Sequence, residues 1–352
     1  MFSNLPFSYM FVFTMVTGTL FSISSSHWLG IWAGLEINLI GFLPLLVYQK
    51  SMAESESAVK YFVIQALGSG LLMFGSLMSY SLSFTWDVSM SNGFYAFGMF
   101  TIICGLCVKM GLFPFHFWLP SVMAGLPWIS CLLLATWQKF APIFLIGSLM
   151  EVNLIYWAAL VISIMCAGSS LAGGVGGINQ TQIRALLAYS SIGHLGWIVF
   201  SLLYSDWAMK IYLTIYVLIS LCIFMSLWFS NLSDMKSLNK LNYKSNLEMS
   251  VMLMLMSLGG LPPLLGFVSK WLVISLAMSS SLWGILFFLI LGSLLSLFYY
   301  LSLFFSLSMN QIKKEFSVAI SEGMFIKLVN LIVLFNLIGG LLLVMSNSME
   351  SL

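Results

Sequence analysis

Long apolar segments separated by short polar connections occupy almost the whole chain. Most of them are close to the roughly 20 residues that a helix needs to cross a bilayer. The pattern predicts an all-α fold, a polytopic transmembrane bundle forming a single domain over residues 1–352, with a polar loop at 231–248 between spans eight and nine. The eleven predicted spans lie at about 6–25, 28–48, 58–80, 94–115, 127–149, 154–173, 180–203, 207–230, 249–279, 283–307 and 323–345.

Two of these segments contain residues that break helices. The ninth is too long for one straight crossing and carries Gly-Gly-Leu-Pro-Pro at 259–263, while Gly111, Pro114 and Pro120 follow the end of the fourth. Proline removes a backbone donor, and in hydrocarbon such a break is tolerated where protein covers the backbone or where it lines a polar cavity. The sequence therefore predicts two broken helices, a device that transporters use to build binding sites, and suggests an internal duplication.

Composition supports an integral membrane protein. Hydrophobic residues make up 61% of the chain and charged residues only 7%, against about a quarter in soluble domains. The net charge of +2 leaves no basic surface large enough for nucleic acid, which we exclude as a partner. Such an apolar exterior must be covered by phospholipids and by neighbouring protein. We expect cardiolipin among these phospholipids.

Basic residues are distributed unevenly over the connections. Nine lie in or beside connections that follow even-numbered spans, whereas Lys210 alone follows an odd-numbered one. By the positive-inside rule, the N-terminus faces the cytoplasm-like compartment. With an odd number of spans, the C-terminus faces the opposite side.

Four charged side chains lie inside apolar segments: Glu36, Lys109, Lys139 and Lys270. A charge at mid-helix costs about 2.5 to 3.5 kcal/mol on insertion scales, so such residues indicate an ion or proton path. Burial favours the neutral form of a lysine and a nearby carboxylate favours the charged form, which makes Lys109 the candidate switch. The alternative is a structural ion pair, or a lysine that snorkels to the interface. Lys139, near the middle of its span, fits that alternative least, and Lys270, beside a break, fits it best.

His194, in the seventh span, can donate and accept a proton near neutral pH. It is a candidate relay, and a histidine that only bonds two helices together is the alternative. All five cysteines fall in apolar segments, and the pair Cys104 and Cys107 is expected to pack and not to bind metal. The chain carries no nucleotide-binding glycine loop and no cysteine set for an iron–sulfur cluster, so we expect no cofactor or metal bound to it.

Six short motifs around these residues occur in a characteristic order. Because of these motifs and their order, the chain resembles the NADH dehydrogenase subunit 2 family of mitochondrial respiratory complex I over essentially its whole length. The motifs are Gly34–Asn38, the run from Lys109 through Pro114–Pro120, Thr136–Pro142, Asn179–Arg184, Ala188–His194, and Gly260–Phe267 leading to Lys270 and Trp271.

The resemblance implies an antiporter-like subunit of a proton-pumping membrane arm. Such subunits are built from two inverted five-helix repeats, and the animal form lacks the first three helices of the bacterial one. It also implies roles for the buried charges: Glu36 and Lys109 as the acid and lysine pair, Lys139 as the central lysine, and Lys270 as the lysine of the second broken helix. With the resemblance, His194 is favoured as a relay.

The same resemblance implies that NADH, FMN, iron–sulfur clusters and ubiquinone belong to partner subunits, and that other membrane-arm subunits of complex I are the protein partners. It places the chain in the inner mitochondrial membrane, with the N-terminus on the matrix side and the C-terminus on the intermembrane-space side.

Two other functions are compatible with the residues alone. One is a stand-alone cation/proton antiporter, and the other is a membrane scaffold whose charges only hold helices together.

Overall fold

The structure is a computed structural model, and most of the chain is described in it as helix. The described residues are 7–47, 51–84, 86–87, 96–152, 156–230, 245–262, 264–278, 282–312, 333–334 and 336–340. Within these ranges the only β-type pairing is an isolated bridge between His27 and Asp87. The chain divides into two compact units, Met1–Met165 and Cys166–Leu352. The predicted all-α bundle is confirmed.

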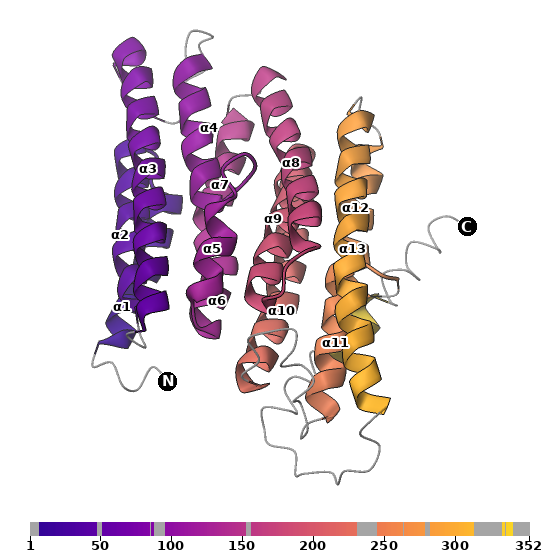
Figure 1. The fold of residues 1–352 in the computed structure, drawn as a ribbon. Coiled ribbons are helices and arrows are strands. Elements are labelled where there is room, and N and C mark those ends of the chain that lie inside the picture. Colours follow the sequence, from indigo (N-terminus) through magenta and orange to yellow (C-terminus); the bar gives the residue numbers. More distant parts are fainter. Residues whose placement is uncertain are drawn as a thin grey trace. The chain divides into compact units, whose positions relative to one another are not determined.

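The first unit is a set of helices in which the first three pack side by side (Figure 1). Helices α1 and α2 approach so closely that a Cβ added at Gly34 would lie 2.6 Å from the backbone nitrogen of Ser22. Glycine at this contact is therefore what lets the two backbones meet. The helices of this unit are α1 (Ser8–Ser24), α2 (Trp28–Leu46), α3 (Met52–Ser83), α4 (Ala96–Met110), α5 (Trp118–Gly125), α6 (Trp128–Ala135), α7 (Trp137–Val152) and the first part of α8 (Tyr156–Gly177).

The second unit is arranged around α9, whose side chains are almost all buried. Helix α8 packs closely on α9, because a Cβ at Gly173 would lie 2.6 Å from the carbonyl oxygen of Tyr189. Besides the end of α8, this unit contains α9 (Ile183–Leu202), α10 (Asp206–Ser230), α11 (Ser245–Gly259), α12 (Leu265–Ala277) and α13 (Trp283–Ile312).

The apolar helices correspond to the first ten predicted spans. Among the described residues, seven stretches are long and apolar enough to cross a membrane, namely α2, α3, α6 with α7, α8, α9, α10 and α13. Four shorter apolar helices, α1, α4, α11 and α12, account for the rest of the described spans. The predicted eleventh span, 323–345, lies outside the described residues except at 333–334 and 336–340, which are helical. The predicted loop 231–248 lies outside them up to residue 244, and α11 begins directly afterwards.

Both predicted helix breaks are present and are built in the same way. Helix α4 ends at Met110 and α11 ends at Gly259, and each is followed by a glycine with positive φ, 76° at Gly111 and 82° at Gly260. In each case the next amide reaches back five residues: Leu112 to the carbonyl of Cys107 at 3.0 Å, and Leu261 to that of Met256 at 3.3 Å. This is the Schellman termination, which requires a left-handed residue and so favours glycine.

A third interruption was not predicted. The segment 127–149 was expected to be one continuous helix, but α6 ends at Ala135 and α7 begins at Trp137. The amide of Lys139 donates to the carbonyl of Thr136, only three residues back, at 3.2 Å. Pro142, inside α7, has no N–H to give to the carbonyl four residues earlier. Lys139 therefore lies in the first turn of a new helix and not in the middle of an unbroken one.

Candidate functional site

Glu36 on α2 and Lys109 in the last turn of α4 form an ion pair inside the first unit. The Nζ of Lys109 lies 3.7 Å from Oε1 of Glu36, and 4% and 26% of the two side chains are exposed. This distance allows strong attraction but is longer than a direct hydrogen bond. Oε1 of Glu36 has no hydrogen-bond partner among the described residues. The contact is thus a Coulomb attraction, and no direct hydrogen bond fixes the distance between the two groups.

The surroundings of Lys109 satisfy its backbone and make room for its side chain. Gln65 of α3 donates through Nε2 to the Lys109 carbonyl at 3.2 Å, and the indole of Trp118 donates to the Val108 carbonyl at 3.2 Å. Both acceptors are carbonyls of the last helical turn, which have no partner within the helix. A Cβ at Gly68 would lie 3.0 Å from Cγ of Lys109. The lysine is therefore fixed at the end of α4, where the helix dipole favours a positive charge.

Lys139 is buried in the first turn of α7, and an amide pair lies directly beside it. Asn38 donates through Nδ2 to Oε1 of Gln138 at 2.8 Å, and Gln138 donates through Nε2 to Oδ1 of Asn38 at 3.2 Å. The two bonds join α2 to α7. Since Asn38 is two residues from Glu36 and Gln138 adjoins Lys139, the pair fixes the register between the helices that carry the two charges.

Lys270 is buried on α12, behind the break. Its ammonium donates to two carbonyls at the end of α11, those of Gly259 at 2.9 Å and Leu258 at 3.3 Å. A side chain at Gly260 would meet this ammonium, because a Cβ there would lie 3.0 Å from Nζ. Lys270 thus turns inward to the broken helix and does not snorkel to an outer surface.

His194 lies on α9 in the second unit, with its ring against two tyrosines of α10. Nδ1 of His194 lies 3.1 Å from the hydroxyl of Tyr212, and the ring centroid of Tyr216 is 5.4 Å from that of the imidazole. His194 and Lys270 line the same small cavity, which has room for about a single water molecule. The structure therefore brings the histidine and the lysine of the second broken helix to one polar space.

The predicted residues form local groups. Glu36 and Lys109 meet directly, Lys139 is tied to α2 through its neighbour, and His194 shares a cavity with Lys270. Asn38 and Gln138 lie in two of the six motifs, but the hydrogen bonds between them were not predicted, and neither were the contacts of Gln65 and Tyr212. An amide inside an apolar span was the available signal, because a buried amide requires a partner.

The buried cysteines lie among apolar side chains. Sγ of Cys107 is 3.7 Å from the sulfur of Met165, and the thiol of Cys131 is 3.4 Å from the carbonyl of Met123. Within the part of the chain that the structure describes, no three His, Cys, Asp or Glu side chains come together as metal ligands would.

Comparison with known proteins identifies the family. Residues 25–296 match the family described as NADH:quinone oxidoreductase/Mrp antiporter, TM. The chain is 40% identical to the NADH-ubiquinone oxidoreductase chain 2 of Lumbricus terrestris over 83% of its own length and 84% of that protein. It is 37% identical to the chain 2 of Anopheles gambiae over 95% and 96% of the two chains.

A solved structure agrees with these relatives. A chain of respiratory complex I from Thermus thermophilus superposes with a TM-score of 0.81 and 27% identity, over 96% of this chain and 79% of the other. The similarity thus covers both units and all the predicted site residues. The chain belongs to the NADH-ubiquinone oxidoreductase chain 2 family, among the antiporter-like membrane subunits of complex I.

Proposed function

We propose that Glu36, Lys109, Lys139, His194 and Lys270 transfer protons across the membrane, and that through them the chain acts as a proton-translocating membrane-arm subunit of NADH:ubiquinone oxidoreductase. The observation that carries this proposal is the buried ion pair of Glu36 and Lys109 at 3.7 Å. A charge inside an apolar bundle is costly, so the distance between Glu36 and Lys109, which no direct hydrogen bond fixes, decides how strongly the charged form of the lysine is favoured. Family membership supports the same function.

The pair supplies a switch. While Glu36 lies beside Lys109, it neutralises the lysine charge, and Lys139 can take up a proton. When the pair opens, the charge of Lys109 repels the proton held at Lys139 and favours its transfer toward Lys270 and the exit side. His194 receives and passes on protons in the cavity that it shares with Lys270. This chain would then convert redox energy into charge movement by electrostatic coupling.

We infer the surroundings of the chain from the same family. NADH, FMN, iron–sulfur clusters and ubiquinone would be bound by partner subunits, and other membrane-arm subunits would cover part of this chain. Phospholipids, cardiolipin among them, would cover the rest. The chain would lie in the inner mitochondrial membrane, with its N-terminus on the matrix side and its C-terminus on the intermembrane-space side, as the distribution of basic residues indicates.

The test is proton pumping per electron in reconstituted complex that carries Lys139→Met, with a native gel to check assembly. We expect normal assembly and a loss of pumping or of coupled turnover, because the substitution keeps an unbranched side chain as far as Cε and removes the proton-binding nitrogen. Lys210→Met, at an exposed position of α10, is the matched control and should pump normally. Unchanged pumping in assembled Lys139→Met complex would refute the site assignment and support the scaffold function.

A further inference from the structure

Helix α12 begins directly after the second break, and its own sequence provides no cap for its first turn. The N-cap position is Leu264, whose side chain cannot accept a hydrogen bond from the backbone. Leu264 and Leu265 are both buried. The first amides of a helix have no partner within the helix, and a buried amide requires one. The start of α12 therefore depends on an acceptor from another part of the chain.

Asn336 supplies that acceptor from the helical residues 336–340. Its side chain is buried, and its Oδ1 accepts from the amide of Leu265 at 3.0 Å. Its Nδ2 donates to the sulfur of Met254 on α11 at 3.1 Å. The oxygen thus contacts the helix that follows the break and the nitrogen contacts the helix that precedes it. One amide side chain joins α11 and α12 across the break.

Small residues bring the backbones together around this amide. A Cβ added at Gly339, about one turn after Asn336, would lie 3.1 Å from the side chain of Leu265. A Cβ added at Gly266 would overlap the carbonyl oxygen of Ser257 on α11. The first turn of α12 is therefore packed between α11 on one side and the residues around Asn336 on another.

The position of Lys270 depends on this first turn. Lys270 follows Leu265 by five residues in the same helix, which is about 1.4 turns. Its ammonium donates to the carbonyls of Gly259 and Leu258 at 2.9 and 3.3 Å. Because a contact near 3.6 Å is no longer a hydrogen bond, a displacement of α12 by roughly 1 Å away from α11 would remove both bonds.

We propose that Asn336 is a positioning residue for Lys270. By capping α12 and joining it to α11, it holds the lysine ammonium at the carbonyls of the broken helix. Asn336 acts through the backbone of α12 and does not itself exchange a proton. This inference rests on the proposed function, because the role of Lys270 as a proton site belongs to that proposal.

The experiment compares Asn336→Leu with Asn336→Asp by protons pumped per electron and by coupled turnover per assembled complex. Leucine keeps the branching at Cγ and removes the acceptor, whereas aspartate keeps an oxygen that a helix N-terminus favours. We expect Asn336→Leu to lower coupled turnover about tenfold, the effect of one unsatisfied buried amide. We expect Asn336→Asp to keep at least about half of the turnover, because the acceptor for the Leu265 amide remains.

This order of effects separates positioning from packing. If Asn336 only filled space, leucine would replace it better than aspartate, because a carboxylate is the costlier group to bury. The matched control is Ile338→Ala, at an exposed position of the same helical segment, which should keep the wild-type turnover.

Hydrogen exchange in the assembled complex measures the cap itself. The peptide that covers the first turn of α12 should exchange about tenfold faster in Asn336→Leu than in wild type, because the Leu265 amide has lost its acceptor. Asn336→Asp and Ile338→Ala should exchange as wild type does.

The outcomes distinguish this inference from the proposed function. If Asn336→Leu pumps as wild type while Lys139→Met loses pumping, the positioning role is wrong and the proposed function stands. If Asn336→Asp loses as much turnover as Asn336→Leu, the acceptor oxygen is not what matters and the inference is overturned. Should Asn336→Leu fail to assemble, Asn336→Asp decides: retained turnover and slow exchange support the inference, and loss of either overturns it. If Lys139→Met pumps normally, the proposed function fails and this inference fails with it.

Discussion

Replacing Glu36 with glutamine tests the switch most directly, because it removes one charge and keeps the shape. At 3.7 Å and an effective dielectric constant near 20, the pair with Lys109 is worth about 4.5 kcal/mol. About a quarter of the Glu36 side chain is exposed, so solvent screens part of this attraction. Even about 2 kcal/mol would change the ratio of charged to neutral Lys109 roughly thirtyfold. We therefore expect Glu36→Gln to lose most proton pumping per electron.

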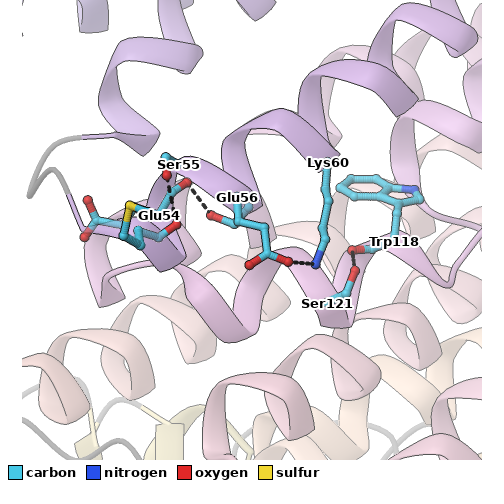
Figure 2. A network of polar contacts seen from close by, with 8 residues as sticks. Glu54, Ser55, Glu56, Lys60, Trp118 and Ser121 are labelled. Atoms are coloured by element: carbon cyan, nitrogen blue, oxygen red, sulfur yellow. Dashed lines mark hydrogen bonds and ion pairs between the residues drawn. The ribbon is translucent and has the colours of Figure 1, made fainter.

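The assay measures pumping in proteoliposomes and compares Glu36→Gln with Glu36→Asp. The shorter acid keeps its charge at about 5 Å, where roughly 3 kcal/mol of attraction remains, so it should keep part of the pumping. The control is Glu56→Gln on α3. Figure 2 shows that Glu56 pairs with Lys60 one turn further on. Their charged atoms are 2.6 Å apart, and both side chains are exposed. Such pairs contribute at most about 1 kcal/mol, so this variant should behave as wild type.

One result would refute this reasoning. If Glu36→Gln assembles and pumps as many protons per electron as wild type, the charge of Glu36 does not control Lys109. If Glu36→Gln and Glu36→Asp lose pumping equally, the exact position of the acid matters more than the Coulomb attraction calculated from the distance.

Two further predictions concern the groups that hold the charged residues in place. Asn38→Ala and Gln138→Ala should each destabilise the assembled subunit by about 1 to 3 kcal/mol, because each leaves a buried amide unpaired. The double variant should lose less stability than the sum of the two single losses, as measured by thermal unfolding of the complex. Gly260→Ala should lower coupled turnover, because the φ of 82° and a lysine atom 3.0 Å from the new Cβ leave no place for a methyl group. Gly259→Ala should leave coupled turnover unchanged, because its Cβ would meet nothing closer than 3.6 Å.

The sequence predicted the helices well because the bilayer imposes a simple rule on them. A crossing helix must be apolar over a fixed length, so hydropathy alone locates the first ten spans within a few residues. Glycine and proline predicted the ends of α4 and α11, since glycine adopts positive φ and proline lacks a backbone N–H. The interruption at Thr136 was missed because threonine gives no such signal, and the available sign was Pro142, six residues further on.

The candidate site was less predictable, because charges are visible in a sequence and their partners are not. Glu36, Lys109, Lys139 and Lys270 stand out in an apolar chain whatever the fold. The hydroxyl that pairs with His194 belongs to a tyrosine on another helix, and tyrosine is common in membrane helices. Only the packing of α9, α10 and α12 shows which of the thirteen tyrosines matters.

The two broken helices use one type of termination for two different purposes. Lys109 precedes its break, and its charge faces the side chain of Glu36 at 3.7 Å, a distance that no direct hydrogen bond fixes. Lys270 follows its break and is held by the backbone carbonyls of α11, which the glycine turn fixes in place. A proton site that faces a side-chain acid can be switched by a change in that distance, whereas one balanced by fixed carbonyls has a constant affinity. We therefore expect control of proton transfer at Lys109, with Lys270 and His194 serving as the steady exchange site that it feeds.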